Sequence, residues 1–422
     1  MAHDLARRTA GVSGRAGLST RAWVFIVLAG IAAAMHVWKL PGVLVQVRDE
    51  LGMSLVASGV LLGIVQVAAM LAALAVSLFS EVLGLRRTLV AGIGFLALGS
   101  LVGAASTEVW HLMATRAVEG IGFLRVTVTA PPLIRRCTPA RLVSTAVGGW
   151  SAFQGTALLL ALTVSTLLAT GAFTGGDGMS WRTWWIIMGV LTLATVPGVL
   201  LQVPADPRDQ AVDVRAGLRR INATVRTARP WLLGVVFGCY TVQWGAVLMF
   251  LPTMLAASGV DPVTAGVATA VAGGCNAVGA VVTGLLLRRG APVRPLVATG
   301  LVTMAVTTVA IYSVDWTQVP GGALWVLLAA ALFSGIGGTI PSALTCVAVD
   351  AAPPGGSGAA VIGVLTQVFN LFNFLGPVLL AAITDAAGGW HLSWTMTVGT
   401  SVLGLLIAWP VLSPRRTPAL ER

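Results

Sequence analysis

The sequence predicts an all-α membrane protein with twelve transmembrane helices in two pseudo-symmetric six-helix bundles. Three observations lead to this prediction. Of its 422 residues, 56% are hydrophobic and only 10% are charged, against about a quarter in a typical soluble domain. Most of the chain consists of uncharged stretches of about 20 residues or more, the length that a helix needs to cross a bilayer. One longer polar segment, 204–229, divides these stretches into two equal sets.

The apolar stretches give the predicted helices in chain order. A β-barrel is excluded because the alternating apolar and polar pattern of its strands is missing. The first stretch should be a retained helix, since no convincing cleavage site ends it. The two stretches that contain charged residues are 22–46, with Lys39, and 110–134, with Arg116, Glu119 and Arg125. The uncharged stretches are 51–80, 88–107, 142–176, 183–205, 230–260, 262–287, 295–314, 316–349, 351–384 and 386–414.

The basic residues of the loops predict the orientation. Most of them fall in the two tails and in the alternate loops that share a side with the tails, and only Arg48 and Arg182 fall on the other side. The positive-inside rule therefore places both termini in the cytoplasm. The predicted divisions are a cytoplasmic N-terminal tail (1–21), an N-terminal bundle (22–203), a cytoplasmic central loop (204–229), a C-terminal bundle (230–413) and a cytoplasmic C-terminal tail (414–422). The basic part of the central loop could form a short helix on the inner surface or a plain linker.

Composition also excludes several function classes. The net charge of +11 belongs to loops that face anionic lipid headgroups, so it predicts contact with membrane lipid and no nucleic-acid partner. The four cysteines lie far apart in or beside apolar runs, which favours free buried thiols. No phosphate-binding loop occurs, and the four histidines show no metal-ligand spacing. We therefore expect no cofactor, no metal and no enzymatic activity.

Two local motifs carry a family resemblance. The segment SLFSEVLGLRR places Glu81, Gly84, Arg86 and Arg87 where the major facilitator superfamily has its Gly-x-x-x-Asp-Arg-x-Gly-Arg-Arg loop, although other positions depart from that pattern. The segment RAVEGIG resembles the superfamily's Arg-x-x-Gln-Gly-x-Gly, with Glu119 in place of the usual glutamine. The chain therefore resembles the major facilitator superfamily, and within it the cyanate permease and 2-nitroimidazole transporter group, through segments such as LPGVLVQVRDELGMS and PPLIRR.

The resemblance implies a function. It implies a monomeric secondary transporter in the inner membrane that carries a small solute by alternating access. It also implies that the first, fourth, seventh and tenth helices line the central cavity. Three embedded basic residues face one embedded acid, which favours a small anionic or polar solute, cyanate-like or carboxylate-like. Efflux of drugs or small aromatic compounds by the same fold is the alternative.

The charges inside the predicted spans are the main candidate site residues, since an embedded charge should face a cavity or a partner. Lys39, with His36 one turn below it, either contacts a substrate anion or extends to the outer headgroups. Arg116 and Glu119 are three residues apart and can pair in place; they are either a structural ion pair or part of a proton relay. Arg125 projects to nearly the opposite helix face from Arg116. It binds either a substrate anion or a partner elsewhere.

Uncharged polar side chains complete the prediction. Tyr240 and Gln243 lie on a helix that lines the cavity by resemblance, and Gln154 lies in the fifth predicted helix. The predicted substrate-binding residues are Lys39, Arg125, His36, Tyr240, Gln243 and Gln154. The residues predicted for proton coupling or gating are Glu119, Arg116, Glu81 and Arg86.

Overall fold

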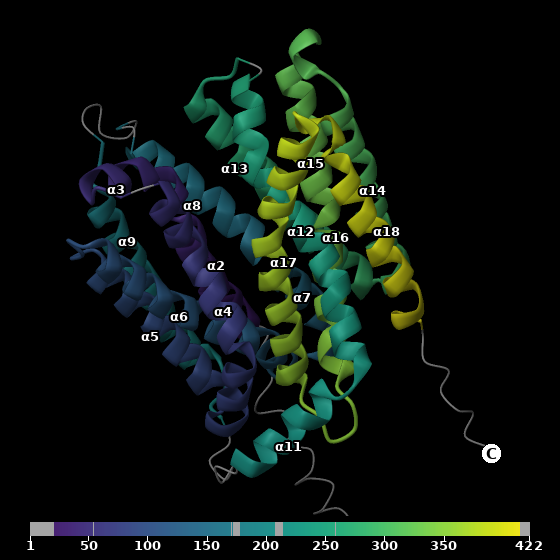
Figure 1. The fold of residues 1–422 in the computed structure, drawn as a ribbon. Helices are drawn as coiled ribbons and strands as arrows, with labels where there is room; N and C mark the ends of the chain where they lie inside the picture. Colours follow the sequence, from purple (N-terminus) through teal and green to yellow (C-terminus); the bar gives the residue numbers. More distant parts are fainter. Residues whose placement is uncertain are drawn as a thin grey trace, which may run out of the picture.

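The structure of the chain, a computed structural model, describes residues 21–53, 55–169, 171, 178–206, 214–257 and 259–413. These residues form helices and connecting turns, with no strand among them. Two groups of helices stand side by side, with the earlier part of the chain in one group and the later part in the other (Figure 1). The predicted all-α architecture of two six-helix bundles is therefore confirmed.

The first bundle contains six spans. Two of them are built from two consecutive helices that meet at a break in the backbone. The helices are α2 (Ala22–Trp38), α4 (Leu55–Leu83), α5 (Leu85–Gly103), α6 (Val109–Cys137), α7 (Val143–Ser151) followed by α8 (Phe153–Ala169), and α9 (Trp181–Leu193) followed by α10 (Thr195–Gln202).

The second bundle has the same organisation, with one broken span. Its helices are α12 (Ala228–Ala257), α13 (Pro262–Arg288), α14 (Val293–Ser313), α15 (Gly322–Gly337) followed by α16 (Thr339–Ala348), α17 (Gly358–Ala387) and α18 (Trp394–Val411). Asp261 caps the start of α13 by accepting hydrogen bonds from two backbone N–H groups, and Pro262 fills the first helical position.

The lengths of these helices fit a bilayer. Among the described residues, eleven helical segments are long and apolar enough to cross a membrane. The helix α4, at 29 residues, supplies a twelfth of spanning length. The predicted number of spans therefore agrees with the fold.

Two short helices lie at opposite ends of the molecule. The helix α3 (Leu44–Glu50) follows a turn at Pro41, where the backbone leaves α2, as expected for a residue without an N–H group. Glu50 ties this end to α9, because its carboxylate accepts hydrogen bonds from Arg182 at 2.8 Å and from the Trp181 indole at 2.6 Å. The helix α11 (Val214–Val225) lies at the other end (Figure 1), so the central segment forms a helix there.

The two bundles touch where glycines remove side chains from the interface. A Cβ atom on Gly148 of α7 would lie only 2.6 Å from Cα of Gly284 on α13. A Cβ on Gly155 of α8 would approach the backbone of Ala277 on α13 to 2.8 Å. These backbones therefore pack in direct contact, as small residues permit between membrane helices. On the other side of the molecule, Asn373 of α17 donates a hydrogen bond to Gln66 of α4 at 2.6 Å.

Candidate functional site

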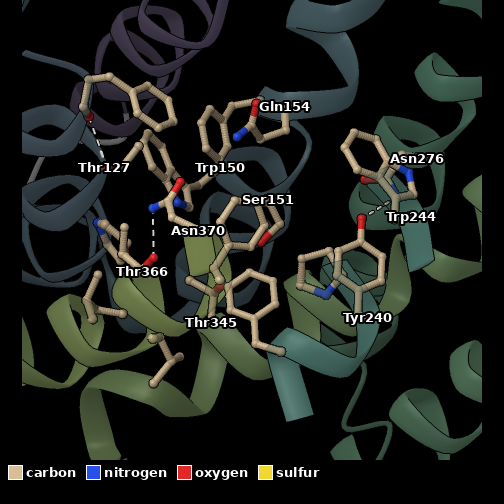
Figure 2. A pocket seen from close by; sticks show the side chains of 18 residues that line it. Thr127, Trp150, Ser151, Gln154, Tyr240, Trp244, Asn276, Thr345, Thr366 and Asn370 are labelled. Atoms are coloured by element: carbon tan, nitrogen blue, oxygen red, sulfur yellow. Dashed lines mark hydrogen bonds between the residues drawn. The ribbon is translucent and has the colours of Figure 1, made fainter. Parts of the chain in front are cut away.

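A cavity lies between the two bundles. It contains about 730 Å³ of space not occupied by protein atoms, its opening included. Figure 2 shows its walls, with Tyr240, Trp244 and Asn276 on one side and Asn370 and Thr366 on the other. The residues that line it are Phe123, Thr127, Pro131, Trp150, Ser151, Phe153, Gln154, Phe237, Tyr240, Trp244, Asn276, Pro341, Thr345, Ile362, Leu365, Thr366, Phe369 and Asn370.

The lining is aromatic and amide-bearing and contains no charged side chain. Its residues come from α6, α7, α8, α12, α13, α16 and α17, so the first span contributes none of them. The family resemblance implied a cavity lined by the first, fourth, seventh and tenth spans, and three of these four contribute. Ser151 and Gln154 lie on either side of the break between α7 and α8, and both line the cavity; the break itself was not predicted from the sequence.

Two lining side chains have polar atoms without a partner among the described residues. These atoms are Oδ1 of Asn370 and the hydroxyl oxygen of Ser151. Both are buried, and neither takes part in a hydrogen bond with the residues that the structure describes. The orientation of the Asn370 amide is fixed, because its nitrogen donates to the carbonyl of Thr366 at 2.7 Å. Buried polar atoms are nearly always paired in proteins. Ser151 and Asn370 therefore each contribute one unpaired polar atom to the wall of the cavity.

On the opposite wall, the polar side chains are hydrogen-bonded to one another. Asn276 donates to the hydroxyl of Tyr240 at 2.8 Å and to the carbonyl of Ser334 at 3.0 Å. The indole of Trp244 donates to the Ser334 hydroxyl at 3.1 Å. The Tyr240 and Trp244 rings also stack, with centroids 6.2 Å apart. This network holds both aromatic faces in fixed positions against the cavity.

Trp38 connects this cavity to the interior of the first bundle. Its ring packs edge-to-face against Trp244 of the other bundle, with centroids 6.2 Å apart. Its indole N–H donates to Oε1 of Gln154 at 3.3 Å. Trp38 is the last residue of α2, and the next residue is Lys39. Movement of this helix end would therefore be transmitted to the cavity.

Lys39, Glu119 and Arg116 form a buried ionic cluster inside the first bundle. The Lys39 ammonium donates to Oε1 of Glu119 at 2.5 Å, and Arg116 Nη1 donates to Oε2 at 2.6 Å. All three side chains are fully buried. Arg116 also donates to the backbone carbonyl of His36 at 2.5 Å. The i, i+3 spacing predicted the Arg116–Glu119 pair, whereas the Lys39–Glu119 pair joins helices distant in sequence.

Polar and aromatic side chains from two further helices enclose the cluster. Lys39 donates to the Ser100 hydroxyl of α5 at 2.7 Å and lies 4.2 Å from the ring centroid of Trp185 on α9. His36 lies with Nδ1 3.3 Å from Glu119 Oε1, and its Nε2 is 2.8 Å from the Thr192 hydroxyl. Ser100, Trp185 and Thr192 were not identified from the sequence, because isolated hydroxyls and aromatics are common in membrane helices.

Three of the predicted substrate-binding residues take other positions. Lys39 and His36 belong to the cluster and are not among the residues that line the cavity. Arg125 lies over the rings of Phe79 and Phe95, whose centroids are 5.7 and 5.0 Å from its guanidinium carbon. It does not line the cavity either.

Of the other three predicted binding residues, two line the cavity and one does not. Gln154 and Tyr240 line the cavity. Gln243 instead donates within the second bundle, to the Cys239 carbonyl at 2.8 Å and to the Ser401 hydroxyl at 3.0 Å.

The motif between α4 and α5 is organised around an acid that was not predicted from the sequence. The Asp206 carboxylate accepts hydrogen bonds from the backbone N–H groups of Arg86 and Arg87, at 3.2 and 3.0 Å, and from Arg136 at 3.0 Å. It therefore caps the N-terminus of α5. Gly84, with φ +95°, precedes this helix, and a Cβ there would lie 2.4 Å from the Asp206 carboxyl carbon.

Arg86 and Glu81 complete this region. The Arg86 guanidinium donates to the Leu200 carbonyl at 2.5 Å. The side chain of Glu81 lies outside the described residues, so its predicted gating role stays a prediction. Arg135 of the first bundle also contacts the second bundle. It donates to both carboxylate oxygens of Asp350 at 2.5 Å and to the Cys346 carbonyl at 2.9 Å.

Comparison with known families and structures identifies the fold. A family model described as Major Facilitator Superfamily matches residues 23–318 and, in a second match, 233–422. The chain belongs to the major facilitator superfamily. It is thus an integral membrane protein of a family of secondary transporters for small solutes. Within the described residues, no group of three or more His, Cys, Asp or Glu could hold a metal ion.

A solved structure shares the superfamily fold. It is described as the major facilitator superfamily proton:xylose symporter XylE bound to 6-bromo-6-deoxy-D-glucose, and it superposes with a TM-score of 0.74. The alignment covers 93% of this chain and 95% of that chain at 15% sequence identity. At this identity the likeness concerns the fold alone. The search among curated proteins gave no match.

Proposed function

We propose that the protein is a proton-coupled transporter for a small, planar, uncharged polar solute that binds in the cavity between the bundles. The observation that carries this proposal is the pair of unpartnered atoms, Asn370 Oδ1 and the Ser151 hydroxyl, in an uncharged aromatic lining. An amide oxygen can only accept a hydrogen bond. The solute should therefore present an N–H or O–H group to Asn370, which a simple anion such as cyanate lacks.

The aromatic walls add a shape requirement. Tyr240 and Trp244 are held by the Asn276 and Ser334 network, so they present fixed ring faces. A flat solute gains contact area against such faces without reorganising them. This favours a small planar compound, which is also the chemistry of the aromatic-compound efflux alternative.

Proton coupling is supported by the buried cluster. An embedded ionisable group in a transporter commonly belongs to a proton pathway. Lys39, Arg116 and Glu119 are fully buried beside Trp38, and Trp38 contacts both Gln154 and Trp244 of the cavity. A change of protonation in the cluster would therefore act next to Trp38, which contacts two residues that line the cavity.

A small anion remains the second candidate substrate. The observation that favours it is the excess positive charge of the cluster, where Lys39 and Arg116 face the single carboxylate of Glu119. No cavity-lining residue is charged, so the attraction would act over a longer distance than a direct ion pair.

Ligand binding separates the two candidates. The detergent-purified protein is heated with 2-nitroimidazole, which is planar and carries an N–H donor, or with the anions cyanate and benzoate. We expect 2-nitroimidazole to raise the melting temperature and the anions to leave it unchanged. Stabilisation by cyanate or benzoate alone would favour the anion candidate instead.

Variants connect that binding to the cavity. Asn370→Leu removes the free acceptor and should weaken 2-nitroimidazole binding about 2- to 12-fold, the effect of one hydrogen bond of about 0.5–1.5 kcal/mol. Gln367→Leu is the matched control on the same helix, because Gln367 does not line the cavity. Equal affinities of both variants and wild type, measured by titration calorimetry, would place the binding elsewhere.

We further propose that the protein works as a monomer in the inner membrane, with both termini in the cytoplasm and bundles at 22–203 and 230–413. The basic residues of the loops and tails support this orientation. Reporter fusions after residues 107 and 177 should read as periplasmic, and fusions after 137 and 215 as cytoplasmic. One inverted pair would contradict the proposed orientation.

A further inference from the structure

The buried cluster carries an unequal charge. Lys39 and Arg116 are two cations, and Glu119 is the carboxylate that both contact, with all three side chains fully buried. His36 faces both Lys39 and Glu119, with Nδ1 3.4 Å from the ammonium and 3.3 Å from the carboxylate. From the helices packed against α2, the described side chains that contact the Lys39 ammonium are otherwise uncharged: Ser100 of α5 and Trp185 of α9.

Among the described residues, no second carboxylate contacts the cluster to balance the excess charge. The Nε and Nη2 atoms of Arg116 are buried without a hydrogen-bond partner among the described residues. With Lys39 and Arg116 both protonated and His36 neutral, the cluster has one uncompensated positive charge in a region without solvent exposure. Burial of an uncompensated charge is unfavourable. One proton of the cluster should therefore be held loosely.

The identity of that proton follows from the three possible changes. An arginine does not lose its proton in proteins. Protonation of Glu119 would leave two cations without an anion, which increases the imbalance. Release of a proton by Lys39 leaves the Arg116–Glu119 pair, held at 2.6 Å, with no net charge. Only the last change removes the imbalance.

We infer that Lys39, the single lysine of the chain, carries the coupled proton, and that Glu119 is its permanently ionised counter-ion. This inference rests on the proposed proton coupling. In the step, one N–H bond of the Lys39 ammonium breaks and the proton passes to water on one side of the membrane, while the electron pair stays on the nitrogen. Protonation from the other side reverses it.

The step is linked to the cavity through the end of α2. Lys39 follows Trp38 directly, and its backbone carbonyl accepts a hydrogen bond from the Trp184 indole at 3.1 Å. When the ammonium becomes an amine, its attraction to Glu119 is lost. The end of α2 is then held less tightly against α6, and Trp38 can shift against Trp244 and Gln154.

A spectroscopic measurement tests the inference on the protein alone. Protein grown with 15N- and 13C-labelled lysine gives one side-chain signal, because the chain has one lysine. We expect the Nζ and Cε shifts of this signal to change from ammonium to amine within the pH range in which transport depends on pH. An ammonium that persists to about pH 10, the behaviour of an ordinary lysine, would overturn the inference. Loss of the signal in Lys39→Arg confirms its assignment.

Transport by variants gives an independent test in proteoliposomes loaded with 2-nitroimidazole. Lys39→Arg keeps the positive charge and leaves Glu119 in place, but cannot release a proton. We expect it to keep exchange of labelled for unlabelled solute and to lose uphill accumulation and pH dependence. If Glu119 were the proton carrier, Lys39→Arg would still accumulate solute uphill with the wild-type pH profile, and the inference would fail.

The outcomes distinguish this inference from the proposed function. If wild-type protein moves 2-nitroimidazole without moving protons, as read by a pH-sensitive dye inside the vesicles, the proposed proton coupling fails. If wild type couples and Lys39→Arg couples equally, the proposed function stands and only the assignment to Lys39 fails. Should Lys39→Arg not elute as a monodisperse protein, the lysine spectrum of the wild type decides.

Discussion

Replacing Glu119 with glutamine should destabilise the protein strongly. Both oxygens of this carboxylate accept charge-assisted hydrogen bonds, from Lys39 at 2.5 Å and from Arg116 at 2.6 Å. At an effective dielectric constant of about 20, one pair of charges about 4 Å apart attracts by about 4 kcal/mol. Lys39 and Arg116 stay buried in the variant, so neither side chain recovers its solvation by water. The expected loss in unfolding free energy is therefore about 3–5 kcal/mol.

The assay is thermal and denaturant unfolding of detergent-purified protein, with an exposed glutamate as the control. Glu50 also pairs with an arginine, Arg182, at 2.8 Å, but its side chain is 45% exposed. Glu50→Gln should therefore lose less than about 1 kcal/mol. A loss for Glu119→Gln no larger than that of the control would refute the assignment of a tightly coupled buried pair.

A second substitution in the Glu119→Gln background tests the reason for the loss. Adding Lys39→Met removes a buried polar group that has lost its counter-ion, so it should restore part of the lost stability. The two changes should be non-additive by about 1–3 kcal/mol, as for residues in direct contact. Purely additive effects would show that Lys39 and Glu119 do not interact in the folded protein.

Two further predictions concern the ends of the helices. Gly84→Ala should cost about 1–3 kcal/mol, because φ is +95° and the new Cβ would meet the Asp206 carboxyl group; Gly94→Ala, with open space around it, should be neutral or stabilising in the same unfolding assay. Hydrogen bonds from Arg182 hold the pKa of Glu50 below its usual 4.5, so the contribution of Glu50 is present above that pH and lost as the pH falls through the lower folded-state value. The melting difference between wild type and Glu50→Gln should then shrink between about pH 5 and pH 3, and a difference that grows there would contradict the pairing.

The sequence predicted the parts of the fold and site that depend on local spacing. Uncharged stretches located the spans, and the three-residue spacing predicted the Arg116–Glu119 pair. The nine-residue spacing predicted that Arg116 and Arg125 project to nearly opposite faces of their helix, and in the structure they contact different helices: Arg116 contacts α2, and Arg125 lies over rings of α4 and α5. Each of these follows from helix geometry within a single helix.

The features that were missed depend on how helices pack. Lys39 meets Glu119 across 80 residues of sequence, and the rotation of α2 against α6 decides that contact. The cavity atoms of Ser151 and Asn370 are notable only because nothing pairs with them, which requires all neighbours to be known. Nothing in the sequence distinguishes Asp206 from other acidic loop residues, and only the fold shows that it lies at the start of α5.

The glycine contacts between the bundles affect how the protein can change shape. At Gly148 and Gly284 the backbones of α7 and α13 touch without interlocking side chains. One helix can therefore rotate against the other without first separating interdigitated side chains. An alanine at either position would add a methyl group that obstructs this rotation. Turnover would then slow even where the solute still binds with unchanged affinity.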